Sequence, residues 1–162
     1  MSDVSVLPGT VAVRNLFEDL LGREVTVSPG DPLSADQIAT STVAIFTDTA
    51  QQIYAVLGME LALSANAGAA LGLLPAGAAE DSIDEKKLFP NLAENVFELC
   101  NVLTSLLNRE GGPHIKLHQV VYPGDPLPAD ARAHLMALGR RVDLMVEVNR
   151  YGKGKFSLSL AP

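Results

Sequence analysis

The most regular pattern of apolar and polar positions in the chain runs through residues 91–108. At about 100° per residue, the polar side chains there gather on one side of a helix, and the apolar ones on the other. The polar stripe consists of Glu94, Glu98, Asn101, Ser105 and Asn108, and the apolar stripe of Leu92, Val96, Leu99, Leu103, Leu106 and Leu107. This pattern predicts an amphipathic helix that packs on a core and presents its polar stripe to solvent or a partner. Asn91 is its expected N-cap, with Glu94 completing a capping box.

Three further segments have helical patterns. Thr10–Leu21 is amphipathic and is followed by Gly22, which suits a left-handed C-terminal cap. Residues 60–73 mix leucines with alanine and glycine, which predicts a buried helix that permits close packing. Residues 129–138 predict a short helix. Residues 75–89 are charged and lack a clear apolar stripe, so we interpret them as a linker.

Alternating apolar residues and turn signals predict the strands. The expected strands are residues 24–28, a hairpin of 42–47 and 53–57, residues 114–124 broken at Pro123, and a C-terminal hairpin of 142–148 and 156–160 turning at 151–154. This order predicts a single α+β domain over residues 10–162, with an antiparallel sheet and two or three long helices packed on one face. Residues 1–9 are expected to be an N-terminal tail.

Composition excludes several classes of function. The net charge of -7 disfavours a nucleic-acid surface, which needs clustered lysine and arginine. No membrane helix is predicted, because the most apolar run, residues 53–75, contains Glu60, Ser64 and Asn66. The start of the chain lacks the pattern of a secretory signal, so a cytoplasmic protein is expected. The single cysteine, Cys100, excludes an intramolecular disulfide.

Within the polar stripe, Glu98 and Asn101 form an ExxN motif on the exposed face of the predicted helix. An acidic residue, Glu94, lies four positions before the glutamate, and Pro123 lies just over twenty residues beyond the asparagine. This arrangement resembles the signature of the CheC/CheX/FliY chemotaxis phosphatases. The order of predicted elements is also similar to that family over nearly the whole chain, and the single motif helix resembles CheX more than CheC. The family usually has Asp or Ser at the position of Glu94, and its asparagine-to-proline gap is one residue longer.

The resemblance implies a phosphatase that hydrolyses the aspartyl phosphate of a CheY-like response regulator. Asn101 would orient the attacking water and Glu98 would anchor the partner, which makes these two the predicted catalytic residues. Glu94 and Ser105 are the predicted partner-binding residues, although Glu94 alternatively serves only the capping box. No cofactor or metal of the protein's own is implied, since Mg²⁺ would be carried by the receiver domain. The resemblance also implies a homodimer.

Two other functions stay open at this stage. The first is a non-catalytic CheX-like module that binds a receiver domain or another partner, which the altered surroundings of the motif favour. The second is a small-molecule pocket under the helix of residues 60–73, for which a deep cavity beside Gly68 and Gly72 would be the sign.

The remaining candidates for chemistry have simpler interpretations. His114 and His118 flank Lys116 with no evident third ligand, so a solvated strand face is favoured over a metal site. Cys100 lies beside the apolar stripe and is expected to be a partly buried thiol. Residues 151–155, YGKGK, lack the spacing of a phosphate-binding loop and predict a hairpin turn.

Overall fold

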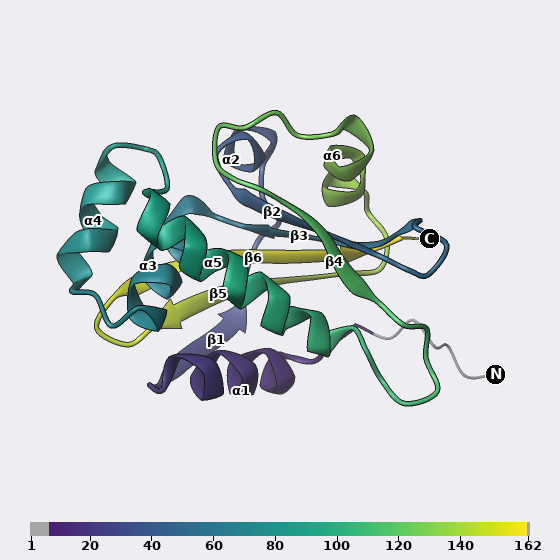
Figure 1. Ribbon diagram of the computed structural model, residues 1–162, viewed down its shortest axis with the longest axis horizontal. Helices are drawn as coiled ribbons and strands as arrows, with labels where there is room; N and C mark the ends of the chain where they lie inside the picture. The colour runs from purple at the N-terminus through teal and green to yellow at the C-terminus, as the bar shows by residue number, and fades with distance from the viewer. Residues whose placement is uncertain (1–6, 162) are drawn as a thin grey trace.

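Six strands form one antiparallel sheet in the order β1-β5-β6-β3-β2-β4 (Figure 1). The computed structural model describes residues 7–161, so residues 1–6 of the expected tail lie outside the described part of the chain. The strands are β1 (Val25–Pro29), β2 (Thr42–Thr47), β3 (Ile53–Met59), β4 (Lys116–Val121), β5 (Arg141–Val148) and β6 (Gly152–Leu160). The helices are α1 (Thr10–Leu21), α2 (Ala35–Ala39), α3 (Leu61–Leu71), α4 (Ala76–Asp84), α5 (Pro90–Leu103), the 3₁₀ turn η1 (Thr104–Leu106) and α6 (Ala129–Met136). The predicted α+β fold is confirmed.

Helices cover both faces of this sheet. The long helices α1, α3 and α5 contribute to one large core, as predicted for one face. The short helices α2 and α6 build a second core on the other face, and Figure 1 shows them above the strands while α1 lies below. Strand β2 alternates between the two cores, with Ala44 and Phe46 in the first and Val43 and Ile45 in the second. All six residues of β2 are therefore buried.

The segment interpreted as a linker contains helix α4, so that prediction is wrong. The helix buries Ala79 and Ser82, which are too small to produce a visible apolar stripe. The Ser82 hydroxyl donates to the Lys87 carbonyl and accepts from the Phe89 amide, which fixes the chain as it leaves α4. The Tyr151 hydroxyl donates to the Leu74 carbonyl just before α4 begins. Packing and these tertiary bonds, rather than amphipathic periodicity, hold this helix.

The C-terminal hairpin turns two residues earlier than predicted. Strand β6 already begins at Gly152, which pairs with Val148, so the turn occupies residues 149–151. Further along β6, a Cβ on Gly154 would lie 2.4 Å from the Leu63 backbone nitrogen. Glycine is therefore needed at this position of β6, because the backbone of α3 lies directly against the strand.

A second glycine brings α5 against α3. A Cβ on Gly68 would lie 3.0 Å from the Leu92 carbonyl oxygen and 3.2 Å from Val96 Cγ2. The Asn95 side chain donates a hydrogen bond of 2.9 Å to the Gly68 carbonyl. The close packing expected of the Ala/Gly-rich helix is thus present, and it fixes the face that α5 turns to the core.

A nearly buried ion pair joins α6 to the sheet. Arg141 Nε lies 2.9 Å from Asp143 Oδ2, and Arg141 Nη2 lies 3.0 Å from Asp143 Oδ1. The side chains are 10% and 12% exposed. Arg141 Nη1 also donates to the carbonyls of Leu135 and Ala137 at the end of α6. Asp143 thereby orients the guanidinium that caps the C-terminal carbonyls of α6.

We expect Gly68→Ala to lower the free energy of unfolding by about 1–3 kcal/mol, because the added methyl overpacks the α3–α5 contact. Gly77→Ala is the matched control, since Gly77 lies in α4 and a Cβ there meets nothing within 4 Å. It should raise stability by about 0.4–1 kcal/mol. Urea unfolding measures both changes, and equal effects of the two substitutions would contradict the proposed packing.

We expect Asp143→Ala to destabilise the protein by about 3–5 kcal/mol, since it leaves the Arg141 charge nearly buried and unpaired. Glu85→Ala is the control, because the Glu85–Lys87 pair is exposed, with its charged atoms 3.7 Å apart. That loss should stay within about 0.5 kcal/mol. Thermal and urea unfolding compare the two variants, and a loss at position 143 as small as that at position 85 contradicts the assigned role.

Candidate functional site

Helix α5 carries three of the four predicted site residues. Its N-cap is Phe89, with Pro90 at the first helical position and no side-chain capping bond. Proline suits this position because its φ is preset and its missing N–H would be unpaired anyway. The helix therefore begins before Asn91, whose side chain instead accepts from the Leu92 amide. The predicted capping box of Asn91 and Glu94 is wrong, and capping does not explain Glu94.

The packing of α5 on α3 turns the motif outward. Val96, Leu99 and Leu103 are buried against the core, while Glu94, Glu98 and Asn101 are exposed on the other side of the helix. Residues three and four apart on a helix are surface neighbours, so these three side chains form one continuous strip. Figure 1 shows α5 lying across the sheet with its outer side uncovered by another helix.

Ser105 continues this strip beyond the end of α5. The predicted helix of residues 91–108 ends at Leu103 and tightens into η1, where Ser105 is exposed. The Thr104 hydroxyl donates to the Cys100 carbonyl at the transition. Such back-bonding to the helix backbone competes with regular helix geometry. The structure thus places all four predicted residues on one surface. Ser105 lies in a 3₁₀ turn, whereas an α-helix was expected there.

Neither functional group of the ExxN pair has a structural partner. Within residues 7–161, the Glu98 carboxylate and the Asn101 carboxamide form no side-chain hydrogen bond or ion pair. The carboxamide offers both a donor and an acceptor, and the carboxylate offers acceptors alone. The pair is therefore free to bind groups of another molecule, such as a water or a cationic side chain.

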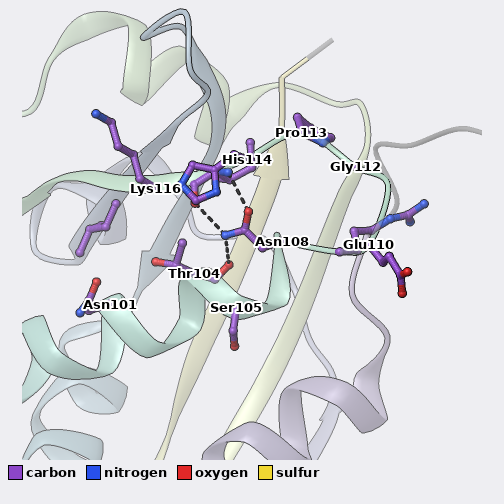
Figure 2. A pocket seen from close by; sticks show the side chains of 12 residues that line it. Asn101, Thr104, Ser105, Asn108, Glu110, Gly112, Pro113, His114 and Lys116 are labelled. Atoms are coloured by element: carbon purple, nitrogen blue, oxygen red, sulfur yellow. Dashed lines mark hydrogen bonds between the residues drawn. The ribbon is translucent and has the colours of Figure 1, made fainter.

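An open groove of about 770 Å³ begins at Asn101 and was not predicted from the sequence (Figure 2). It runs along η1 and the loop to β4, and the basic residues Arg109, His114 and Lys116 line it with Glu110. The strip on α5 is thus acidic before Asn101, whereas the groove beyond it is lined by two cationic side chains, one histidine and one carboxylate.

Asn108 holds the loop that walls this groove. Its Nδ2 donates to the Ile115 carbonyl at 2.7 Å, and its Oδ1 accepts from the Ile115 amide at 2.8 Å. Figure 2 shows these bonds joining the end of η1 to the chain that enters β4. The sequence pattern does not predict these two hydrogen bonds, because they join a residue at the helix end to one seven positions later, across a loop without periodicity.

The other predicted features have structural roles. Cys100 is completely buried, more than expected, and burial raises the pKa of its thiol to about 12. The thiol therefore stays protonated at neutral pH. His114 precedes β4 and His118 lies on it, so the predicted start of this strand at residue 114 is wrong. Within residues 7–161 no three His, Cys, Asp or Glu side chains gather in a way that would hold a metal ion.

The space beside Gly68 and Gly72 is filled. Leu92 and Val96 contact the first position, and a Cβ on Gly72 would lie 2.4 Å from Asn95 Nδ2. The small-molecule pocket considered under α3 therefore has no support. None of the described helices is long and apolar enough to cross a bilayer.

Pro123 directly follows Tyr122, which lies beside the strip. Glu94 and Tyr122 line one hollow, where the end of β4 meets α5. Burial raises the pKa of Tyr122, with a smaller contribution from the negative charge of Glu94. The four positions of the sequence motif are thus on α5 and on the chain directly beside it.

Comparison with known proteins relates this fold to solved structures. No family model matches the chain, and no curated protein matches its sequence. A CheX–CheY–BeF₃–Mg²⁺ complex from Borrelia burgdorferi matches with a TM-score of 0.54 and 11% identity, over 91% of this chain and 92% of the matched chain. FliY from Thermotoga maritima matches with a TM-score of 0.52 and 13% identity, over 91% and 81%. A CheC-like protein from Shewanella oneidensis matches with a TM-score of 0.51 and 16% identity, over 91% of each chain. The chain therefore has the CheX-like fold shared by the CheC/CheX/FliY structures.

Proposed function

We propose that this protein is a phosphatase that hydrolyses the aspartyl phosphate of a CheY-like response regulator. The observation that carries the proposal is the exposed, unpartnered pair Glu98 and Asn101 on the outer side of α5. Polar side chains on a rigid helix, free of internal bonds, suit contact with another protein's active site. The CheX-like fold supports this choice, since one solved structure with that fold is a CheX–CheY complex.

In the proposed reaction, the Asn101 carboxamide positions a water in line with the phosphorus atom. The amide N–H and carbonyl oxygen together orient a water without acting as a base. Glu98 accepts a charge-assisted hydrogen bond from a cationic side chain of the receiver and so fixes the orientation of docking. Catalysis consists of positioning, which alone can contribute several kcal/mol to lowering a barrier.

The proposal assigns no metal or cofactor to this chain. Charge on the phosphoryl group is neutralised by Mg²⁺ that the receiver domain carries, so Glu98 and Asn101 need only complete an existing site. Glu94 and Ser105, at the two ends of the exposed strip, contact the receiver around the reacting group. A cytoplasmic location, where response regulators act, belongs to the same proposal.

A non-catalytic binding module is the second candidate. The same fold occurs in a FliG–FliM complex from Helicobacter pylori, which matches with a TM-score of 0.53 and 6% identity, over 93% of this chain and 85% of the matched chain. Glu94, where the family usually has Asp or Ser, also favours this alternative. In this function the strip on α5 holds a partner without hydrolysing its phosphate.

We further propose a homodimer formed through the sheet. Among the strands of residues 7–161, β4 is an edge strand that pairs with β2 alone, so its outer backbone groups are available to a second copy. Sedimentation equilibrium should give twice the monomer mass of 17.1 kDa. A single species of monomer mass at all concentrations tested would contradict the dimer.

We expect Asn101→Ala to abolish most of the acceleration of phosphate release from a phosphorylated receiver domain. The loss should be about a hundredfold or more, because the attacking water is no longer positioned. The measurement is release of labelled phosphate from receiver domains phosphorylated with a small-molecule donor. Unfolding temperature should be unchanged, since the side chain is exposed and has no internal bond.

Asn91→Ala is the matched control for that experiment. It removes the same side chain from an exposed position in the first turn of α5, far from Asn101 along the helix. Its rate should equal that of the unsubstituted protein. Release no faster than spontaneous decay by the unsubstituted protein would exclude the phosphatase and favour the binding module.

A further inference from the structure

An apolar surface lies at the start of α5, beside the polar strip. Pro90, Ala93, Phe97 and Tyr122, which we call the aromatic shelf, line an open hollow of about 560 Å³ together with Glu94. The Phe97 side chain is 47% exposed. A single exposed apolar residue needs no explanation, but two aromatic side chains lining one hollow next to a candidate site do.

The shelf is continuous with the proposed docking surface. Phe97 lies three residues after Glu94 and four before Asn101, so it neighbours both on the surface of the helix. A protein surface that contacts Glu98 and Asn101 together therefore lies next to Phe97 as well. Phe97 thus borders the face that the proposed docking at the ExxN pair would cover.

The other side of the shelf is rigid. Tyr122 follows β4, whose last residue Val121 pairs with Val43 in β2. The Tyr122 carbonyl accepts a hydrogen bond of 3.0 Å from the Asp125 amide, which closes the turn after the strand. The ring is half-buried against α5, with its position set by the sheet. A preformed aromatic surface loses little conformational freedom on binding, which is typical of residues that dominate protein interfaces.

We propose that the aromatic shelf is the apolar anchor by which this protein recognises its receiver domain, with Phe97 as the central contact. This inference rests on the proposed function and names the surface that selects the partner. Of the described residues that line the hollow, Glu94 alone is charged, and Glu98 follows on the same side of the helix. The matching surface of the receiver therefore presents an apolar side chain bordered by a basic one.

The test uses Phe97→Ala in the full chain, with Phe97→Leu as a conservative variant. The probes are the receiver domains of the source organism, activated with Mg²⁺ and fluoroberyllate, and calorimetry gives their affinity. We expect Phe97→Ala to weaken binding about tenfold or more and Phe97→Leu to restore most of it. In phosphate release, the loss should appear in KM rather than in kcat, since Phe97 touches the partner away from the reacting atoms.

Met136→Ala is the matched control. The exposed fraction of Met136, 49%, is similar to that of Phe97. Met136 lies at the end of α6, on the other face of the sheet. Its affinity should equal that of the unsubstituted protein, and all variants should unfold at the same temperature. Equal affinities of the Phe97→Ala and Met136→Ala variants would overturn the anchor, as would a loss confined to kcat.

The outcomes separate the anchor from the phosphatase. Receiver binding that depends on Phe97, without accelerated phosphate release, supports the anchor and overturns the catalytic proposal. Accelerated phosphate release with an unchanged KM in the Phe97→Ala variant supports the catalytic proposal and overturns the anchor. Failure of every activated receiver to bind the unsubstituted protein overturns both.

Discussion

The contact between α3 and α5 is the constraint on which the arrangement of the surface depends. Gly154 lets α3 lie on the sheet, and Gly68 lets α5 lie on α3. The Asn95 amide, bonded to the Gly68 carbonyl, then fixes the rotation of α5 about its axis. A helix rotated by one residue, about 100°, would carry Glu98 and Asn101 away from their present direction. The exposure of the Glu98 and Asn101 side chains therefore depends on the packing of α5 against α3.

Charged side chains are distributed unevenly along this surface. The acidic residues Glu94 and Glu98 precede Asn101 on α5, and in the groove that follows it the cations Arg109 and Lys116 outnumber the carboxylate of Glu110. An uneven distribution of charge orients an approaching partner and excludes partners of the wrong polarity. The rigid loop held by Asn108 keeps the basic end in place. A partner can therefore be oriented along the strip before any close contact forms.

Strong periodicity made part of the structure predictable from the sequence. The large apolar residues of α1 and α5 recur at helical spacing, and the alternation in β5 marks a strand, so their existence and type follow from local pattern. Short α2 and small-residue α4 lack such a signal, because their stability comes from tertiary packing. The exposed ExxN pair also followed from periodicity. The groove and the aromatic shelf did not, since β4 and its flanking loops reach α5 only in the folded chain.

The separation of α5 into a buried and an exposed stripe has an evolutionary consequence. Substitutions at Leu99 or Leu103 are constrained by the core, whereas the side chains of Glu98 and Asn101 form no hydrogen bond or ion pair with the other described residues. Selection on folding and selection on partner chemistry therefore act on different positions of one helix. A lineage can change the partner of this surface through a few substitutions that leave the fold unaffected. Divergent descendants of such a protein would keep the same architecture long after their sequences ceased to be recognisably related.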